Sequence, residues 1–316
     1  MKLVNLGKTD IKVSPMCFGS LTITPFQSNL PVDRGAYLIR YAFDKGVNFI
    51  DTAQLYNNYE YLQKGFKGVP RQDYVIATKT YAWNKELAKK ALEEALIGLN
   101  TDYIDIFLLH EQESELTIKG HYEALEFLIH AKEKGYIRAV GLSTHRIAGV
   151  IGANKYPEIE ILHPILNKNG LGIPDGNITE MIENLKISKS LEKGIYSMKP
   201  LGGGHLISEV GEAIQFVKNL NLVDSIAIGV QSEEEIDCNV DIIINNQVPV
   251  SKLEKLSNRK RRLIIEDYCI GCGKCVERCD QNALSLKDGK ANVNREKCVL
   301  CGYCATVCED FYIKVV

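Results

Sequence analysis

The stretch Gly46-Val-Asn-Phe-Ile-Asp-Thr-Ala-Gln-Leu-Tyr56 decides how this chain can fold. Its apolar run ends in the carboxylate of Asp51, and the phenol of Tyr56 follows five residues later. A short apolar run that ends abruptly in polar residues is typical of a buried parallel strand whose far end opens onto polar chemistry. Two later runs end in the same way, Tyr74–Lys79 in a lysine and Tyr103–His110 in a histidine.

Strand and helix patterns then alternate along the first 250 residues, after an expected hairpin over residues 3–13. Eight such units favour a closed (β/α)₈ TIM barrel, an α/β fold, over an open doubly wound sheet. The missing Gly-x-Gly-x-x-Gly after the first strand also disfavours a Rossmann fold. The expected strands are Met16–Gly19, Val47–Asp51, Tyr74–Lys79, Ile104–His110, Ile137–Ser143, Ile159–Pro164, Ile195–Pro200 and Ser225–Gly229. Helical patterns include Asp33–Lys45, Lys85–Leu99, Gly120–Lys134, Thr179–Lys193, Ser208–Leu220 and Glu233–Asn245.

In such a barrel the carboxyl ends of all strands lie on one face, so Asp51, Tyr56, Lys79 and His110 are expected to meet there. A phenol with a pKa of about 10 donates a proton poorly at neutral pH, and a nearby ammonium lowers that pKa. A carboxylate can hold the lysine in place, and an imidazole can hydrogen-bond a carbonyl oxygen. The set suits protonation of a carbonyl oxygen while hydride arrives at its carbon. The alternative is a structural ion pair between Asp51 and Lys79, with His110 a satisfied polar group.

The Asp-Thr-Ala-x-x-Tyr spacing, the strand-final lysine and the Leu-Leu-His ending resemble the aldo-keto reductase superfamily. That resemblance implies a catalytic tetrad of Asp51, Tyr56, Lys79 and His110. It also implies an NAD(P)H site on the same face, with Ser143, Thr144, His163 and Asn167 near the nicotinamide amide. His163 stands where the family usually has Gln, and Thr144 where it usually has Asn.

The loops after the last two strands are expected to hold the rest of the cofactor. Lys199-Pro-Leu-Gly-Gly-Gly204 contains Gly202 and Gly203, whose small size lets backbone N–H groups approach phosphate, although a flexible turn is the alternative. The resemblance places the adenosine end at Gly229, Glu235 and Asn239. Three successive glutamates, residues 233–235, would repel a 2′-phosphate, so NADH is favoured over NADPH.

The character of the sequence changes near residue 250. The barrel is expected to span residues 1–250, followed by a charged helical linker over 251–262 and a small α+β domain over 263–316. This last domain contains eight of the ten cysteines in two copies of C-x₂-C-x₂-C-x₃-C. The repeat resembles bacterial two-[4Fe-4S] ferredoxins, in which the fourth cysteine of each run ligates the other cluster.

We therefore expect two [4Fe-4S] clusters. Zinc is the alternative, but paired C-x₂-C elements would satisfy two zinc sites without the third and fourth cysteines so spaced. The first cluster is assigned to Cys269, Cys272, Cys275 and Cys308, and the second to Cys298, Cys301, Cys304 and Cys279.

The net charge of −2 over 316 residues gives no electrostatic footprint for nucleic acid. No stretch of about 18 apolar residues predicts a membrane span, and the start of the chain lacks a signal-peptide pattern. A cytoplasmic protein is the resulting expectation, and it agrees with cysteines used for metal rather than disulfides.

Three functions follow as hypotheses. The first is an aldo-keto-reductase-like oxidoreductase acting on a small-molecule carbonyl substrate, with the clusters serving electron transfer and a possible redox partner protein. The second is a flavin-linked electron-transfer enzyme on the same barrel, because a flavin joins two-electron to one-electron steps. The third is a nucleotide-binding redox sensor or relay without turnover. Tyr81 and Trp83 are expected as an aromatic wall of the substrate site, with exposed aromatics of a surface loop as the alternative.

Overall fold

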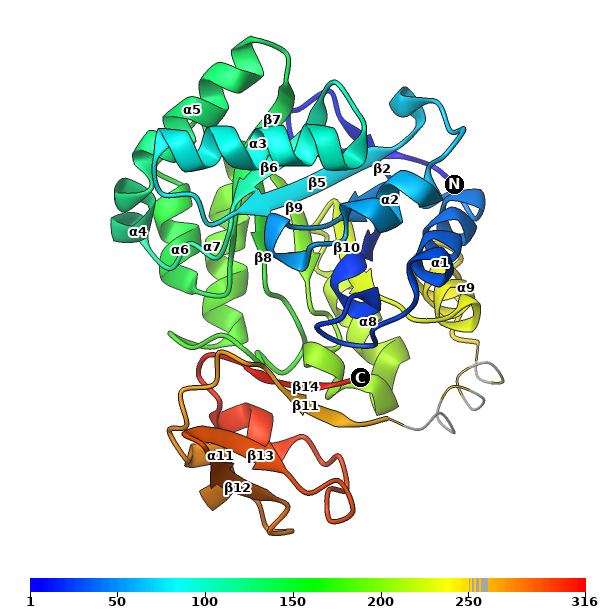
Figure 1. Ribbon diagram of the computed structural model, residues 1–316, viewed down its shortest axis with the longest axis vertical. Helices are drawn as coiled ribbons and strands as arrows, with labels where there is room; N and C mark the ends of the chain where they lie inside the picture. The colour runs from blue at the N-terminus through cyan, green and yellow to red at the C-terminus, as the bar shows by residue number, and fades with distance from the viewer. Residues whose placement is uncertain (250, 252, 254–255, 257–260) are drawn as a thin grey trace.

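A computed structural model describes residues 1–249, 251, 253, 256 and 261–316. Eight parallel strands close into a barrel in the order β10-β3-β4-β5-β6-β7-β8-β9, which confirms the expected fold (Figure 1). The barrel closes where β10 pairs with β3 through Ile226 and Met16. The strands are β3 (Met16–Gly19), β4 (Phe49–Asp51), β5 (Val75–Thr80), β6 (Ile104–Leu109), β7 (Ile137–Thr144), β8 (Ile161–Pro164), β9 (Gly194–Met198) and β10 (Ser225–Gly229).

Several strand boundaries differ by one or two residues from expectation, and the differences at β4 and β9 have local reasons. β4 starts at Phe49 rather than Val47, because the Val47 N–H bonds to the Ala42 carbonyl and finishes the preceding helix. β9 ends at Met198 rather than Pro200, because Lys199 adopts a left-handed backbone with φ 56°. Extended pairing cannot continue through such a residue.

The helices surround the barrel and end where local backbone geometry changes. The expected helix 120–134 is α5, which starts at Tyr122 because the backbone of His121 (φ −106°, ψ 11°) leaves the helical region. Three shorter helices of the barrel, α2, α4 and α6, were not among the expected patterns. The helices are α1 (Val32–Asp44), α2 (Tyr59–Gly65), α3 (Lys85–Leu99), α4 (Glu115–Gly120), α5 (Tyr122–Glu133), α6 (Ile147–Ala153), α7 (Ile178–Ser190), α8 (Val210–Asn219) and α9 (Glu233–Ile243).

The barrel interior is closed at its amino-terminal end by the expected hairpin. Strands β1 (Val4–Asn5) and β2 (Lys12–Val13) pair antiparallel. Leu6, Ile11 and Val13 are fully buried in one cluster with the inward-facing residues of the barrel strands. Because side chains fill this end, the opposite, carboxyl-terminal end is left for chemistry. We call that end the barrel mouth.

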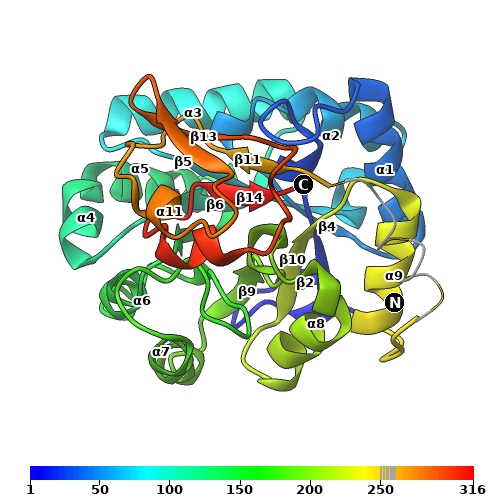
Figure 2. The same cartoon turned by 90° about the horizontal axis from the view of Figure 1, so that it is seen from below.

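The C-terminal domain packs across the barrel mouth (Figures 1 and 2). In it β11 (Leu263–Ile265) pairs antiparallel with β14 (Ile313–Val315), and β12 (Leu284–Lys287) with β13 (Lys290–Val293). A short helix, α11 (Lys274–Glu277), lies between β11 and β12 in sequence. Phe311, only 1% exposed, joins the core cluster of the barrel. The C-terminal domain therefore packs against the barrel through a buried side chain.

The expected helical linker 251–262 lies largely outside the described residues. Within the described parts of the chain, no helix has the length and apolar character needed to cross a membrane.

Candidate functional site

An ion pair between two strands forms the buried floor of the barrel mouth. The Lys79 ammonium on β5 donates to Asp51 Oδ2 on β4 at 2.6 Å and to the Thr52 carbonyl at 2.8 Å. From β9, the Tyr196 hydroxyl donates to Asp51 Oδ1 at 2.9 Å. His163 on β8 stacks on Tyr196 with ring centroids 3.9 Å apart. Asp51 thus receives donors on both oxygens, and its bond to the Lys79 ammonium holds that side chain in place.

Tyr56 lies beside this ion pair in a 3₁₀ turn, η2 (Gln54–Tyr56). Lys79 Nζ is 5.1 Å from the centre of the Tyr56 ring, and the Tyr56 and His110 rings meet edge to face with centroids 6.0 Å apart. The structure therefore brings all four expected residues together. Burial, followed by the charges of Asp51 and Glu111, raises the pKa of the Tyr56 phenol well above its usual value. This direction is opposite to the expected one, because burial disfavours the charged phenolate and the neighbouring carboxylates add to that effect.

His110 is held by ring contacts. Tyr81 stacks on it with centroids 4.3 Å apart and an interplanar angle of 23°. The Tyr81 hydroxyl donates to Glu111 Oε2 at 2.6 Å, which fixes the stacked ring. Burial lowers the pKa of His110 well below its usual value, and its buried Nδ1 has no hydrogen-bond partner among the described residues. The imidazole is accordingly neutral at pH 7.

Two cavities meet at Tyr56. One, of about 560 Å³, extends to α9, and we call it the Asn239 cavity. The other, of about 520 Å³, contains His110, and we call it the His110 cavity. The residues that line both cavities are Leu21, Tyr56, Met198, Lys199 and Lys314. A ligand in either cavity would therefore reach the phenol of Tyr56.

The residues expected to hold the cofactor divide into two groups. Those that line the Asn239 cavity are His163, Lys199, Gly203, Gly229, Glu235 and Asn239. Ser143, Thr144, Asn167 and Gly202 lie outside its lining. The first three instead support loops: Ser143 Oγ accepts from the Glu111 N–H at 2.9 Å, and Thr144 Oγ1 from the Arg146 N–H at 2.9 Å. The Asn167 side chain forms two 2.9 Å bonds with the backbone of Leu171.

The glycine-rich loop after β9 packs against the C-terminal domain. A Cβ added at Gly204 would lie 2.0 Å from the Val315 carbonyl oxygen on β14. One added at Gly203 would lie 2.8 Å from Lys314 Cδ and 3.1 Å from the Phe311 ring. Both glycines have positive φ. Their small size is thus used for close approach of β14, a role that the expected phosphate contact did not include.

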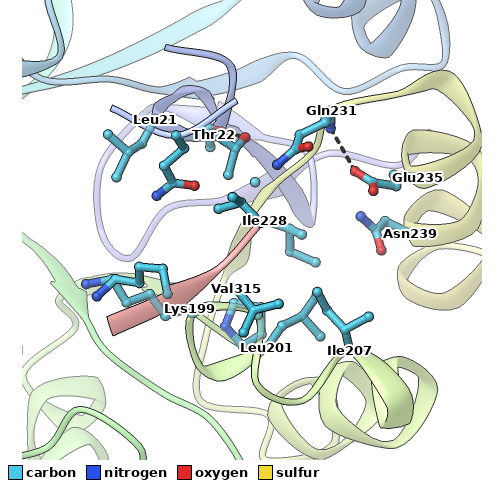
Figure 3. Close-up of a pocket in the computed structure, with 18 of the residues that line it drawn as sticks. Leu21, Thr22, Lys199, Leu201, Ile207, Ile228, Gln231, Glu235, Asn239 and Val315 are labelled. Carbon is cyan, nitrogen blue, oxygen red and sulfur yellow. Dashed lines mark hydrogen bonds between the residues drawn. The ribbon is translucent and has the colours of Figure 1, made fainter. Parts of the chain in front are cut away.

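Figure 3 shows the far end of the Asn239 cavity, where Glu235 and Asn239 on α9 lie across from Lys199. Glu235 Oε2 accepts from the Gln231 N–H at 2.7 Å, and its Oε1 lies 3.8 Å from Arg261. Glu233 is paired with Arg34. Glu235 is thus the member of the acidic run that lines the cavity, where it would face an adenosine ribose.

The eight cysteines form two sets around two hollows. One hollow is lined by Cys269, Cys272, Cys275 and Cys308, and the other by Cys279, Cys298, Cys301 and Cys304. These are the crossed sets expected from the spacing. Backbone N–H groups point at three of the sulfurs, on Cys269, Cys279 and Cys308, at 3.3–3.4 Å. Such N–H···S contacts are suited to cluster thiolates.

A single-ion site does not fit these cysteines. Across the described parts of the chain, no three His, Cys, Asp or Glu side chains are arranged to hold one metal ion. The thiols of each set instead line one hollow.

Sequence patterns missed several residues of the barrel mouth. Tyr196 is a buried hydroxyl inside a strand, and its only signal was a polar-tipped residue within an apolar run. Lys314 and Glu266 come from the C-terminal domain, and nothing in their local sequence indicates that they reach the barrel. Trp83 was expected beside Tyr81, but it is 56% exposed and lines neither cavity.

Comparisons with known proteins agree with this architecture. Residues 15–219 match the Aldo/keto reductase family, and residues 268–310 match a 4Fe-4S dicluster domain. L-galactose dehydrogenase of Arabidopsis thaliana is 29% identical over 225 residues, which are 67% of this chain and 68% of that protein. 6-Dehydroglucose reductase of Novosphingobium aromaticivorans is 27% identical over 232 residues, 64% of this chain and 70% of that protein.

A solved structure supports the fold. Aldo-keto reductase AKR11C1 from Bacillus halodurans superposes with a TM-score of 0.67 at 22% identity, covering 81% of this chain and 96% of its own. At that identity the likeness concerns the fold alone.

Proposed function

The chain belongs to the aldo/keto reductase family and carries a 4Fe-4S domain, and from this premise we propose that it is an oxidoreductase that interconverts a carbonyl compound and an alcohol with NAD(P)H at the barrel mouth. One observation carries the proposal: the Asp51–Lys79 pair lies beside Tyr56, at the point where the two cavities meet. A cofactor in one cavity and a substrate in the other would both reach that phenol.

Tyr56 is the proton donor to the carbonyl oxygen. Its raised pKa keeps the proton on the phenol at neutral pH, and the charge of Lys79 stabilises the phenolate that forms when the proton leaves. Asp51 holds Lys79 by its 2.6 Å bond. Neutral His110 orients the carbonyl group. NAD(P)H, when bound, supplies the hydride to the carbonyl carbon, so that carbonyl, NAD(P)H and one proton become alcohol and NAD(P)⁺.

The Asn239 cavity is the proposed cofactor site, with His163 at its inner end and Asn239 at its outer end. NADH is the proposed cofactor, because Glu235 lines the outer end of this cavity and its carboxylate would repel a 2′-phosphate. Arg261, a cation that lines the same cavity, is engaged with Glu235 at 3.8 Å.

The C-terminal domain is proposed to hold two [4Fe-4S] clusters on the crossed cysteine sets. Such clusters pass single electrons, whereas a nicotinamide exchanges two as hydride. The proposed role of the clusters is electron exchange with a redox partner protein, for which the exposed Cys272 and Cys301 give surface access.

A Tyr56→Phe variant tests the proposal. Loss of the proton donor should lower kcat for NADH-dependent carbonyl reduction about a hundredfold to ten-thousandfold, the range for general acid catalysis. Tyr37→Phe, which changes an exposed tyrosine on α1 (47% exposed), is the matched control. Unchanged turnover in Tyr56→Phe would remove the basis of the proposal. Bound flavin released on precipitation of the protein would instead favour the flavin-linked alternative.

A further inference from the structure

Lys314 is a buried cation aimed at the barrel mouth from the C-terminal domain. It is 6% exposed and lines both cavities. Within the described residues its ammonium has no hydrogen bond or ion pair, and its contact is the face of Phe311, with Nζ 4.1 Å from the ring centroid. A buried ammonium without a partner is costly, so an anion bound beside Lys314 would stabilise its charged form.

Lys199 brings a second cation to the same place. Its Nζ lies 2.7 Å from His145 Nε2, and since burial lowers the pKa of His145 well below its usual value, the neutral imidazole accepts from the ammonium. An ammonium has three donors, so further N–H groups are available to a ligand. The left-handed backbone of Lys199 (φ 56°) is unusual for a side-chain-bearing residue, and such strain is found at functional sites.

The contact with His145 shows which cavity the Lys199 ammonium faces. His145 lines the His110 cavity and not the Asn239 cavity. In Figure 3, Lys199 lies at the end of the view farthest from Glu235 and Asn239. The cation is thus placed toward the His110 cavity, where the substrate is proposed to lie.

Five acidic residues line the His110 cavity, namely Glu111, Glu113, Glu266, Glu309 and Asp310, and three of them have a described partner. Glu111 accepts from Tyr81 at 2.6 Å, Glu113 lies 3.6 Å from Arg146, and Glu309 is paired with Lys274. Burial raises the pKa of Glu266, and the nearby charges of Lys314 and Lys199 oppose that rise. Burial also lowers the pKa of Lys199 to about 8 and that of Lys314 to about 7, so both are poised to gain charge beside an anion.

We propose that Lys199 and Lys314 form an anion subsite beside Tyr56, and that the substrate is a carbonyl compound carrying a carboxylate. The inference rests on the proposed carbonyl reduction and deepens it. Aromatic residues also line this cavity and would contact an apolar substrate body: Tyr81, Tyr268, Phe311 and Tyr312. The Fe–S domain then contributes a specificity residue to the barrel site.

The test uses a matched pair of probes, benzoylformate and its uncharged methyl ester, with the full-length holoprotein. In Lys314→Met, kcat/KM for benzoylformate should fall about tenfold to a hundredfold, the range for losing a hydrogen bond to a charged group, while that for the ester is unchanged. Lys287→Met, an exposed lysine of the same domain, should match the wild type. Equal losses for acid and ester, or no loss, would overturn the proposal.

A binding measurement separates this inference from the proposed reaction. Calorimetric titration of benzoylformate into the protein with NAD⁺ needs no turnover, and its Kd should rise at least tenfold in Lys314→Met. The Kd of NADH should stay within twofold. A rise in the Kd of NADH alone would assign the lysines to the cofactor diphosphate and contradict the proposal. If Lys314→Met loses iron, Lys199→Met on the barrel provides the same test.

Discussion

The Tyr196 hydroxyl donates to Asp51 Oδ1 at 2.9 Å, on the side of the carboxylate opposite to Lys79. Both residues are nearly excluded from water, with Tyr196 fully buried and Asp51 5% exposed. A buried carboxylate oxygen without a donor is costly, so the Tyr196 hydroxyl helps to hold Asp51 in the orientation that binds Lys79. The orientation of Lys79 therefore depends on a strand, β9, that contributes no member of the tetrad.

Replacing Tyr196 by Phe tests this dependence. The variant should lose about 1.5–3 kcal/mol of unfolding free energy, the range for a hydrogen bond to a charged group. Urea denaturation measures it, with Tyr136→Phe, an exposed tyrosine, as the control. Equal stability of the two variants would mean that the bond to Asp51 contributes nothing.

Stability should also fall on acidification because of His163. Burial lowers its pKa from 6.5 to about 4, so the folded protein binds this proton more weakly than the unfolded chain does. The contribution is intact above pH 6.5 and is lost as pH falls toward 4, amounting to roughly 3 kcal/mol. His163→Gln should flatten the decline in the thermal midpoint over this window, whereas His130→Gln, at an exposed site on α5, should leave it unchanged. If the thermal midpoint of His163→Gln declined with pH as steeply as that of the wild type, His163 would not be the cause of the decline.

The docking of β14 on the glycine-rich loop can be tested at one position. In Gly204→Ala the new methyl would meet the Val315 carbonyl oxygen, and φ is 93°. The clash should displace β14 from the Asn239 cavity and raise the Kd of NADH severalfold, measured by fluorescence titration.

The control isolates the clash from backbone strain. Gly135 has a similar φ of 82°, but an added Cβ there meets nothing within 4 Å. Gly135→Ala should therefore lose some stability without changing the Kd of NADH. The docking account fails if the two variants change the Kd alike.

The aromatic contact on His110 offers another matched comparison. Tyr81 stacks on His110 and lines its cavity, whereas Trp83, two residues on, lines neither cavity. Tyr81→Leu should raise KM for the carbonyl substrate several-fold because the imidazole loses its support, and Trp83→Leu should leave KM unchanged. Steady-state kinetics measures KM for both variants. A larger change of KM in Trp83→Leu than in Tyr81→Leu would contradict the role assigned to Tyr81.

The crossed cysteine sets predict which variants share a defect. Cys308→Ser should damage the same cluster as Cys272→Ser, although 36 residues separate them in sequence. Cys279→Ser should instead resemble Cys301→Ser. Iron analysis, with roughly eight iron ions per chain expected for two four-iron clusters, and electron paramagnetic resonance of the reduced variants distinguish the pairs. A shared signature of Cys279→Ser with Cys272→Ser would mean uncrossed ligation.

The strand ends explain how much of the site the sequence predicted. Asp51, Lys79 and His110 could be predicted as site residues because each stands at the end of an apolar run. In a parallel barrel, that pattern fixes the end of the barrel at which the residue lies. The cysteine sets followed from local spacing. Lys314 and Glu266 could not be predicted as site residues, because their positions depend on how the C-terminal domain packs on the barrel. No local sequence pattern indicates that packing. Ser143, Thr144 and Asn167 were expected to touch a ligand, but their hydrogen bonds go to neighbouring loops.

The central claim is hydride transfer at the barrel mouth with proton donation by Tyr56. The most direct measurement mixes the anaerobic holoprotein with NADH deuterated at the transferring C4 position and a carbonyl substrate, and follows deuterium in the product by mass spectrometry. The account predicts one deuterium on the carbinol carbon of the alcohol, and loss of this product in Tyr56→Phe. Alcohol formed without deuterium at that carbon would contradict the account, since the electrons would then have reached the substrate by another route.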